Sequence, residues 1–145
     1  MPRSRGAGRD VADHLADVRL FETCSARDRQ TLAKHIEVVE FATGKRIVSQ
    51  GDAGNAFYVM LDGHAVVRRN GRKVGELHTG DYFGELALLD PSPRNADIVA
   101  SSDVTVGRLL VPAFRKMLRD VPAMNERLLA GLARRVRDAD RHVVE

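Results

Sequence analysis

The chain has 145 residues, which is enough for one domain with its own hydrophobic core. Apolar residues make up 43% and charged residues 30% of it, and the net charge is only +3, so the composition is that of a folded domain and gives no support to DNA binding. Cys24 is the single cysteine, which rules out an intrachain disulfide and favours the cytoplasm, and no apolar run reaches the roughly 18 residues of a membrane helix.

The N-terminal part predicts a tail followed by two short helices. Residues 1–10 are rich in Arg and Gly and lack periodicity, which is typical of a flexible basic tail. From Val11 the apolar residues follow helical spacing. Ser25 is a good N-cap for a second helix, and Asp28 lies three residues later, where a carboxylate favours the helix N-terminus.

Residues 38–111 predict a β-structure. Asp62-Gly63 and Asn70-Gly71 are hairpin signals that follow each other closely, and such regular turns are typical of antiparallel sandwiches and barrels. We expect strands at 38–39, 46–48, 56–61, 64–69, 72–77, 98–100 and 104–110. The predicted fold is therefore mainly β with flanking helices, an antiparallel, jelly-roll-like β-roll of about eight strands.

Two helices are predicted after the β-roll, over about 112–143. Pro112 begins the first at a position where proline is tolerated, and Val121-Pro122 ends it. The second carries an apolar stripe through Leu128, Leu132 and Val136, which predicts either core packing or a homodimer seam. Residues 11–145 are thus expected to form a single domain.

The stretch from Phe83 to Asp97, FGELALLDPSPRNAD, carries the most distinctive chemistry. Gly84 allows a ligand to approach the backbone, and the amides that follow could form an anion-binding nest. Arg94 offers a planar fork of donors that matches phosphate oxygens, and Glu85 is an acceptor suited to a hydroxyl. These residue types fit a ribose phosphate, and they fit a surface salt bridge equally well.

The same stretch resembles the phosphate-binding cassette of cyclic nucleotide-binding domains, which occur in catabolite activators, cyclic-nucleotide-dependent kinase regulatory subunits and gated channels. The upstream run from Gly51-Asp52 to Asp62-Gly63 resembles a second signature of that family, and the similarity covers roughly residues 15 to 143. The resemblance implies that Arg94 holds the cyclic phosphate, helped by the amides of Ala87 and Asn95.

It also implies that Glu85 accepts from the ribose 2′-hydroxyl, that Ile98 faces the sugar or base, and that the last helix covers the purine. The implied ligand-binding residues are Leu77, Phe83, Gly84, Glu85, Leu86, Ala87, Arg94, Asn95, Ala96, Arg135 and Asp140. The expected ligand is cAMP, with cGMP as the alternative, and the expected partner is a protein effector that the sequence does not name.

One departure from the family pattern bears on that expectation. Asp97 puts a carboxylate where many members carry a small residue, and it would weaken binding if it pointed at the phosphate. Two alternatives therefore stay open: a β-roll scaffold that binds no nucleotide, and a fragment of a cAMP-responsive transcription regulator. An enzyme is not expected, because the sequence shows no nucleophile–base pair, metal cluster or phosphate loop.

Overall fold

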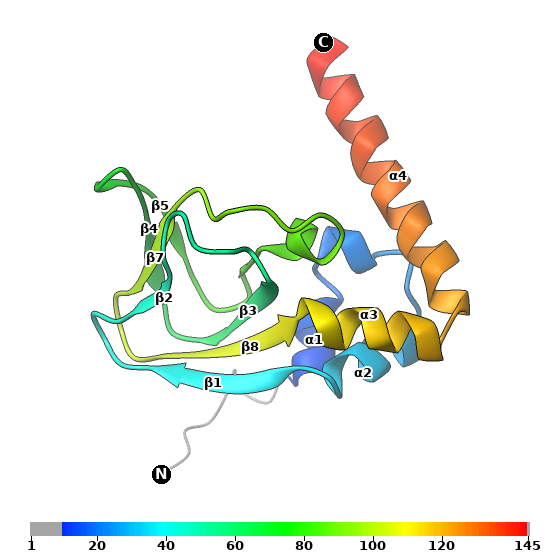
Figure 1. The fold of residues 1–145 in the computed structure, drawn as a ribbon, viewed down its shortest axis with the longest axis horizontal. Helices are drawn as coiled ribbons and strands as arrows, with labels where there is room; N and C mark the ends of the chain where they lie inside the picture. The colour runs from blue at the N-terminus through cyan, green and yellow to red at the C-terminus, as the bar shows by residue number, and fades with distance from the viewer. Residues whose placement is uncertain (1–9, 145) are drawn as a thin grey trace.

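The computed structural model describes residues 10–144, with side chains for all of these except residues 135 and 138–144. Its β part is a roll of two four-stranded sheets, and the helices gather beside one end of it (Figure 1). The strand orders are β1-β8-β3-β6 and β2-β7-β4-β5, and neighbouring strands in each sheet are antiparallel. The predicted fold class is confirmed, while the predicted tail over residues 1–10 lies almost wholly outside the described residues.

The strands lie close to their predicted positions. They are β1 (Glu37–Phe41), β2 (Arg46–Val48), β3 (Ala56–Asp62), β4 (Ala65–Arg69), β5 (Arg72–Leu77), β6 (Tyr82–Phe83), β7 (Asp97–Ala100) and β8 (Val104–Leu110). Only β6 was not predicted, because two residues give no periodicity and the strand is defined by its pairing with β3. The β4–β5 hairpin turns at Asn70 and Gly71, with φ values of 54° and 81°, as expected of a type I′ turn.

The helical elements are α1 (Val11–Leu15), η2 (Arg19–Phe21), α2 (Ala26–Ala33), η3 (Glu85–Leu88), α3 (Val111–Asp120) and α4 (Ala123–Val144). Ser25 caps α2 in a capping box with Asp28, as the sequence predicts. Pro112 lies in the first turn of α3, and Val121 ends that helix. No helix in the described part of the chain is long and apolar enough to cross a bilayer.

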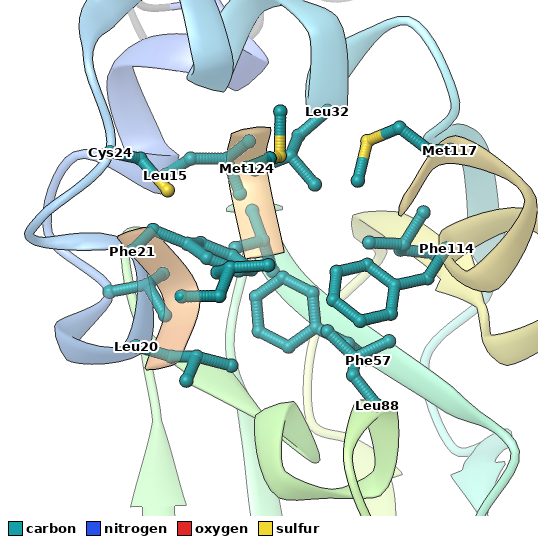
Figure 2. Close-up of a cluster of buried hydrophobic side chains, with 14 of the residues drawn as sticks. Leu15, Leu20, Phe21, Cys24, Leu32, Phe57, Leu88, Phe114, Met117 and Met124 are labelled. Atoms are coloured by element: carbon teal, nitrogen blue, oxygen red, sulfur yellow. The ribbon is translucent and has the colours of Figure 1, made fainter. Parts of the chain in front are cut away.

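Strand β3 is buried on both faces and so separates two apolar cores. Its even-numbered residues, such as Tyr58 and Met60, point into the roll. Its odd-numbered residues face the helices, where Phe57 packs edge-on against Phe21 with 5.8 Å between ring centres. Figure 2 shows this helical core, to which Phe114, Met117 and Met124 also contribute. The continuous apolar run at 56–61 follows from this double burial.

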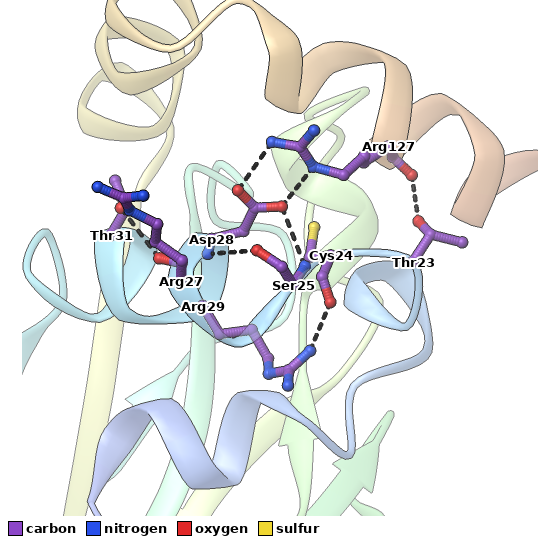
Figure 3. Close-up of polar contacts among 8 residues, drawn as sticks. All are labelled: Thr23, Cys24, Ser25, Arg27, Asp28, Arg29, Thr31 and Arg127. Atoms are coloured by element: carbon purple, nitrogen blue, oxygen red, sulfur yellow. Dashed lines mark hydrogen bonds and ion pairs between the residues drawn. The ribbon is translucent and has the colours of Figure 1, made fainter.

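Helix α4 begins on the N-terminal helices rather than on the roll. Arg127 binds the buried Asp28 of α2 through two hydrogen bonds, Nε–Oδ2 at 2.5 Å and Nη2–Oδ1 at 2.9 Å (Figure 3). Thr23 donates to the Arg127 carbonyl, and a Cβ on Gly131 would lie 2.6 Å from the Leu20 carbonyl oxygen. Beyond these contacts α4 extends away from the roll (Figure 1).

Candidate functional site

The roll encloses one side of a cavity of about 360 Å³ that collects the predicted site residues. Nine of the eleven predicted residues line it: Leu77, Phe83, Gly84, Glu85, Leu86, Ala87, Arg94, Asn95 and Ala96. The side chains of the other two, Arg135 and Asp140, lie outside the described residues. Every described residue that lines the cavity falls between positions 48 and 98, so none of the described side chains of α4 covers it.

Gly84 makes the turn on which the site depends. Strand β6 ends at Phe83, and Gly84 then adopts a left-handed φ of 80° before the 3₁₀ turn η3 begins at Glu85. A Cβ at this position would lie 2.7 Å from Arg94 Nη1 and 2.9 Å from the Ala56 carbonyl oxygen. Only glycine therefore combines this backbone conformation with an arginine packed directly above it.

Arg94 is a cation of the site, and it is half-buried with no carboxylate partner among the residues that the structure describes. Its Nη2 donates to the Ala56 carbonyl at 2.5 Å, and its guanidinium carbon lies 5.7 Å from the centre of the Tyr58 ring. Its Nε is buried and has no hydrogen-bond partner in the described part of the chain. Burial lowers the pKa of Arg94 below its ordinary value. A cation held in this way is stabilised by any anion that enters the cavity.

The upstream Gly51-Asp52 motif positions Arg94. The Gly51 amide donates to the Arg94 carbonyl and the Arg94 amide donates to the Asp52 carbonyl, each at 2.8 Å. A Cβ on Gly54 would collide with the Ser92 carbonyl oxygen, so the two loops pack backbone against backbone. Both motifs were visible in the sequence, but the hydrogen bonds between them were not. Their contact joins residues about forty positions apart, which no local pattern reveals.

Asp97, the departure from the family pattern, points away from the cavity. Its Oδ1 accepts a hydrogen bond of 2.6 Å from the Gln50 amide, and Asp97 is not among the residues that line the cavity. The neighbouring Ala96 and Ile98 line it instead, as expected from the alternation of side chains along β7. The carboxylate therefore caps the loop after β2 and does not oppose an anion beside Arg94.

The backbone amide of Ala87, which the resemblance implies helps to hold the phosphate, makes a hydrogen bond within the chain in this structure. It donates to the Gly84 carbonyl at 3.0 Å, since η3 winds through Ala87. The amide that was expected to help hold a phosphate therefore already has an acceptor. The reason is local, because a 3₁₀ turn satisfies its own donors from the third residue after its start.

Part of the cavity wall was not predicted from the sequence. Val48, Val67 and Arg69 line it from β2 and β4, and Arg69 Nε donates to the Asn95 carbonyl at 3.1 Å. The apolar members are ordinary strand residues, so only their register could have placed them here: Val67 lies opposite Ile98 across the β4–β7 pair. Arg69 is one of several basic residues at a hairpin, and no sequence signal distinguishes it from Arg68.

The fold and the cavity together define a β-roll with a half-buried arginine in the wall of its cavity. The family model described as "Cyclic nucleotide-binding domain" matches residues 38–121, and the chain belongs to that family. This is a family of binding domains, which agrees with the expectation that the chain is not an enzyme.

Relatives and solved structures support the same assignment. The chain is 38% identical over 122 residues to a cAMP-dependent protein kinase regulatory subunit from Mycosarcoma maydis, covering 78% of this chain and 23% of the relative. It is similar to the N-terminal domain of a transcriptional regulator from Streptomyces coelicolor A3(2), with a TM-score of 0.81, 28% identity and coverage of 88% and 94% of the two chains. The chain thus spans about a quarter of the length of the curated relatives it matches.

A third similarity is to a structure solved with a nucleotide. The regulatory domain of Toxoplasma gondii PKA, crystallised with cAMP, matches with a TM-score of 0.65 and 28% identity over 83% of this chain and 48% of the other.

Proposed function

We propose that this chain is a cyclic nucleotide receptor that binds cAMP in the cavity beside Arg94. The single observation that carries the proposal is the half-buried guanidinium of Arg94, which lies over Gly84 and has no carboxylate partner among the described residues. A cyclic phosphate supplies the missing negative charge. Relatives that are cAMP-dependent kinase regulatory subunits favour cAMP over cGMP as the ligand.

Each part of the ligand has a complementary group in the cavity. The phosphate would accept from Arg94, which would exchange its bond to the Ala56 carbonyl for a charge-assisted one. Glu85, at the start of η3, would accept from the ribose 2′-hydroxyl. The apolar walls from Leu77 and Ile98 would contact the sugar and base.

Signal output would depend on α4, whose first turns are fixed to the N-terminal helices. Arg127 and Gly131 hold this part of the helix against α2 and η2. We propose that ligand binding draws the segment after Gly131 towards the open cavity, and that a protein effector in the cytoplasm reads the new position. Such a shift requires that the nucleotide binds the closed arrangement more tightly than the open one.

Calorimetric titration of the purified, nucleotide-stripped protein with cAMP and then cGMP tests the proposal. We expect saturable binding of cAMP by the wild type and its loss in Arg94→Ala, because truncating one partner of a buried charge pair costs about 2–5 kcal/mol. Lys116→Ala, on the exposed face of α3, is the matched control and should bind as the wild type does.

Failure of the wild type to bind either nucleotide would reject the receptor proposal. It would favour the alternative in which the roll is an interaction scaffold. The similarity to the N-terminal domain of a transcriptional regulator supports a third use, in which the same receptor domain controls a DNA-binding partner segment.

A further inference from the structure

Gln50 connects segments of the chain that meet around the loop that carries Arg94. It lies shortly after β2 and directly before Gly51, whose amide donates to the Arg94 carbonyl. The amide of Gln50 itself donates to Asp97 Oδ1 at 2.6 Å. Two successive amides therefore hold Arg94 and the residue three positions after it. The bond to Asp97 is charge-assisted, which makes it the stronger kind of hydrogen bond.

The side chain of Gln50 extends this contact to the end of the β4–β5 hairpin. Its Nε2 donates to Asn70 Oδ1, and its Oε1 accepts from the Asn70 amide, each at 3.0 Å. Asn70 has a φ of 54° and is the only residue other than glycine with a left-handed φ among those that the structure describes. Asparagine tolerates this conformation better than most residues. The turn thus directs both the amide and the side chain of Asn70 at Gln50.

The same hairpin end also contacts the Arg94 loop directly. Arg69 Nε donates to the carbonyl of Asn95, the residue after Arg94. Residues 94–97 are therefore bonded to two separate segments, the loop after β2 and the end of β4. None of these polar residues belongs to either apolar core, so their hydrogen bonds add to the placement of the loop and not to the cores themselves.

We propose that Gln50, Asn70 and Asp97 form a junction (the Gln50 junction) that positions Arg94 for the cyclic phosphate. The guanidinium of Arg94 reaches the cavity from the backbone that this junction holds, and its bond to a phosphate depends on its placement. Asp97 is then a positioning residue that acts through Arg94, although a carboxylate here departs from the family pattern. The inference rests on the proposed receptor function, and it gives a role to three residues that do not line the cavity.

The sign of the effect of Asp97→Ala on cAMP affinity tests the proposal. In calorimetric titration of the full chain, this variant should bind cAMP about tenfold more weakly than the wild type, within the range of couplings in one hydrogen-bond network. Asp97→Asn keeps an acceptor oxygen for the Gln50 amide and should recover most of the loss. A carboxylate that repelled the phosphate would give the opposite sign, because both variants would then bind more tightly.

Asp103→Ala is the matched control. Asp103 Oδ1 accepts from the amide of Thr43 at 3.0 Å, so it caps a loop as Asp97 does, but its partner follows β1 instead of β2. Neither Asp103 nor Thr43 lines the cavity. Asp103→Ala should bind cAMP as the wild type does, while urea unfolding should show similar, small losses of stability in the two alanine variants. A merely structural role of Asp97 would leave both variants with the same affinity.

Gln50→Ala and Asn70→Gly test the contact with the hairpin. Glycine accepts the left-handed φ of Asn70, so Asn70→Gly removes the side chain without straining the turn. Each variant should weaken cAMP binding by about threefold, a small coupling within one network. The double variant should bind no more weakly than Gln50→Ala alone, because both changes break the same contact. Losses that multiply would show that the two residues act independently and would overturn the junction.

Two further results would overturn the inference while leaving the receptor function intact. Tighter binding by Asp97→Ala would show that the carboxylate opposes the ligand. Unchanged affinity in Asp97→Ala would show that Arg94 keeps its position without the junction. In both cases the wild type still binds cAMP. A wild type that binds neither cAMP nor cGMP would reject the receptor function and this inference with it, so the two failures are distinguishable.

Discussion

Arg94 beside the cavity and Arg127 on α4 have contrasting environments. Arg127 meets the carboxylate of Asp28, which is only 6% exposed, and both of its hydrogen bonds go to that partner. Arg94 is half-buried with a carbonyl and an aromatic ring as neighbours. The hydrogen bond between Arg127 and Asp28 lowers the pKa of Asp28 and raises the pKa of Arg127. Burial, in contrast, lowers the pKa of Arg94.

The contrast separates a structural ion pair from a binding site. The charge pair at the helical end is satisfied within the chain and fixes α4 on α2. The cation at the cavity has no counter-charge among the described side chains, which is unfavourable in the empty protein and becomes favourable when an anion binds. We therefore expect loss of the Asp28 carboxylate to change stability and loss of the Arg94 cation to change binding.

The largest effect on stability is expected from Gly84→Ala compared with Gly71→Ala. Both glycines have a φ near 80°, so both variants bear the cost of a left-handed alanine, about 1–2 kcal/mol. Only at Gly84 does the new methyl group meet Arg94 and the Ala56 carbonyl; the space beside Gly71 is open. Gly84→Ala should lose about 1–3 kcal/mol more than its control in urea unfolding. Equal losses would show that Arg94 moves aside freely.

Asp28→Ala should have the next largest effect. It removes the partner of Arg127 and one arm of the capping box of α2. We expect the free energy of unfolding to fall by about 2 kcal/mol, since a hydrogen bond to a charged group and a helix cap each contribute on this order. Urea unfolding followed by circular dichroism measures the loss. Asp120→Ala, at an exposed ion pair on α3, is the control and should change stability by less than about 1 kcal/mol.

Arg94→Met should leave stability unchanged or raise it slightly, by up to about 1 kcal/mol, because it replaces an unpaired, half-buried cation with an apolar chain of similar length. The same variant should fail to bind cAMP in calorimetry. A clear loss of stability would contradict the contrast between the two arginines, since it would mean that Arg94 also supports the fold.

The smallest effect is the dependence of stability on acid pH. The pKa of Asp28 in the folded protein lies below its ordinary value of 3.8, so its ion pair stabilises the fold fully above that value. This contribution is lost as the pH falls through the folded-state pKa. The stability difference between the wild type and Asp28→Asn should therefore be constant from pH 7 to pH 5 and shrink below about pH 4. The pKa values of the exposed carboxylates Glu76 and Asp120 are also lowered. Because both proteins contain these two groups, their contribution to the pH dependence cancels in the stability difference.

Short-range patterns in the sequence were sufficient to predict the local elements and to single out the cassette. Turn glycines, the Ser25 cap and the alternating strand patterns act over a few residues, so the strands and helices could be placed almost to the residue. Gly84, Glu85 and Arg94 were identified because the short stretch that holds them resembles the phosphate-binding cassette of the family. Strand β6 was missed because it depends on β3 as its partner.

The three-dimensional structure was needed to show how distant segments meet. It showed that Asp97 caps the Gln50 amide, a contact between β7 and the loop after β2 that spacing cannot reveal. It placed Arg69 rather than Arg68 in the cavity, since the register of β4 decides which face each side chain joins. It also tied α4 to α2 through Arg127 and Asp28, residues separated by almost a hundred positions. These pairings depend on the packing of whole elements, which no local pattern encodes.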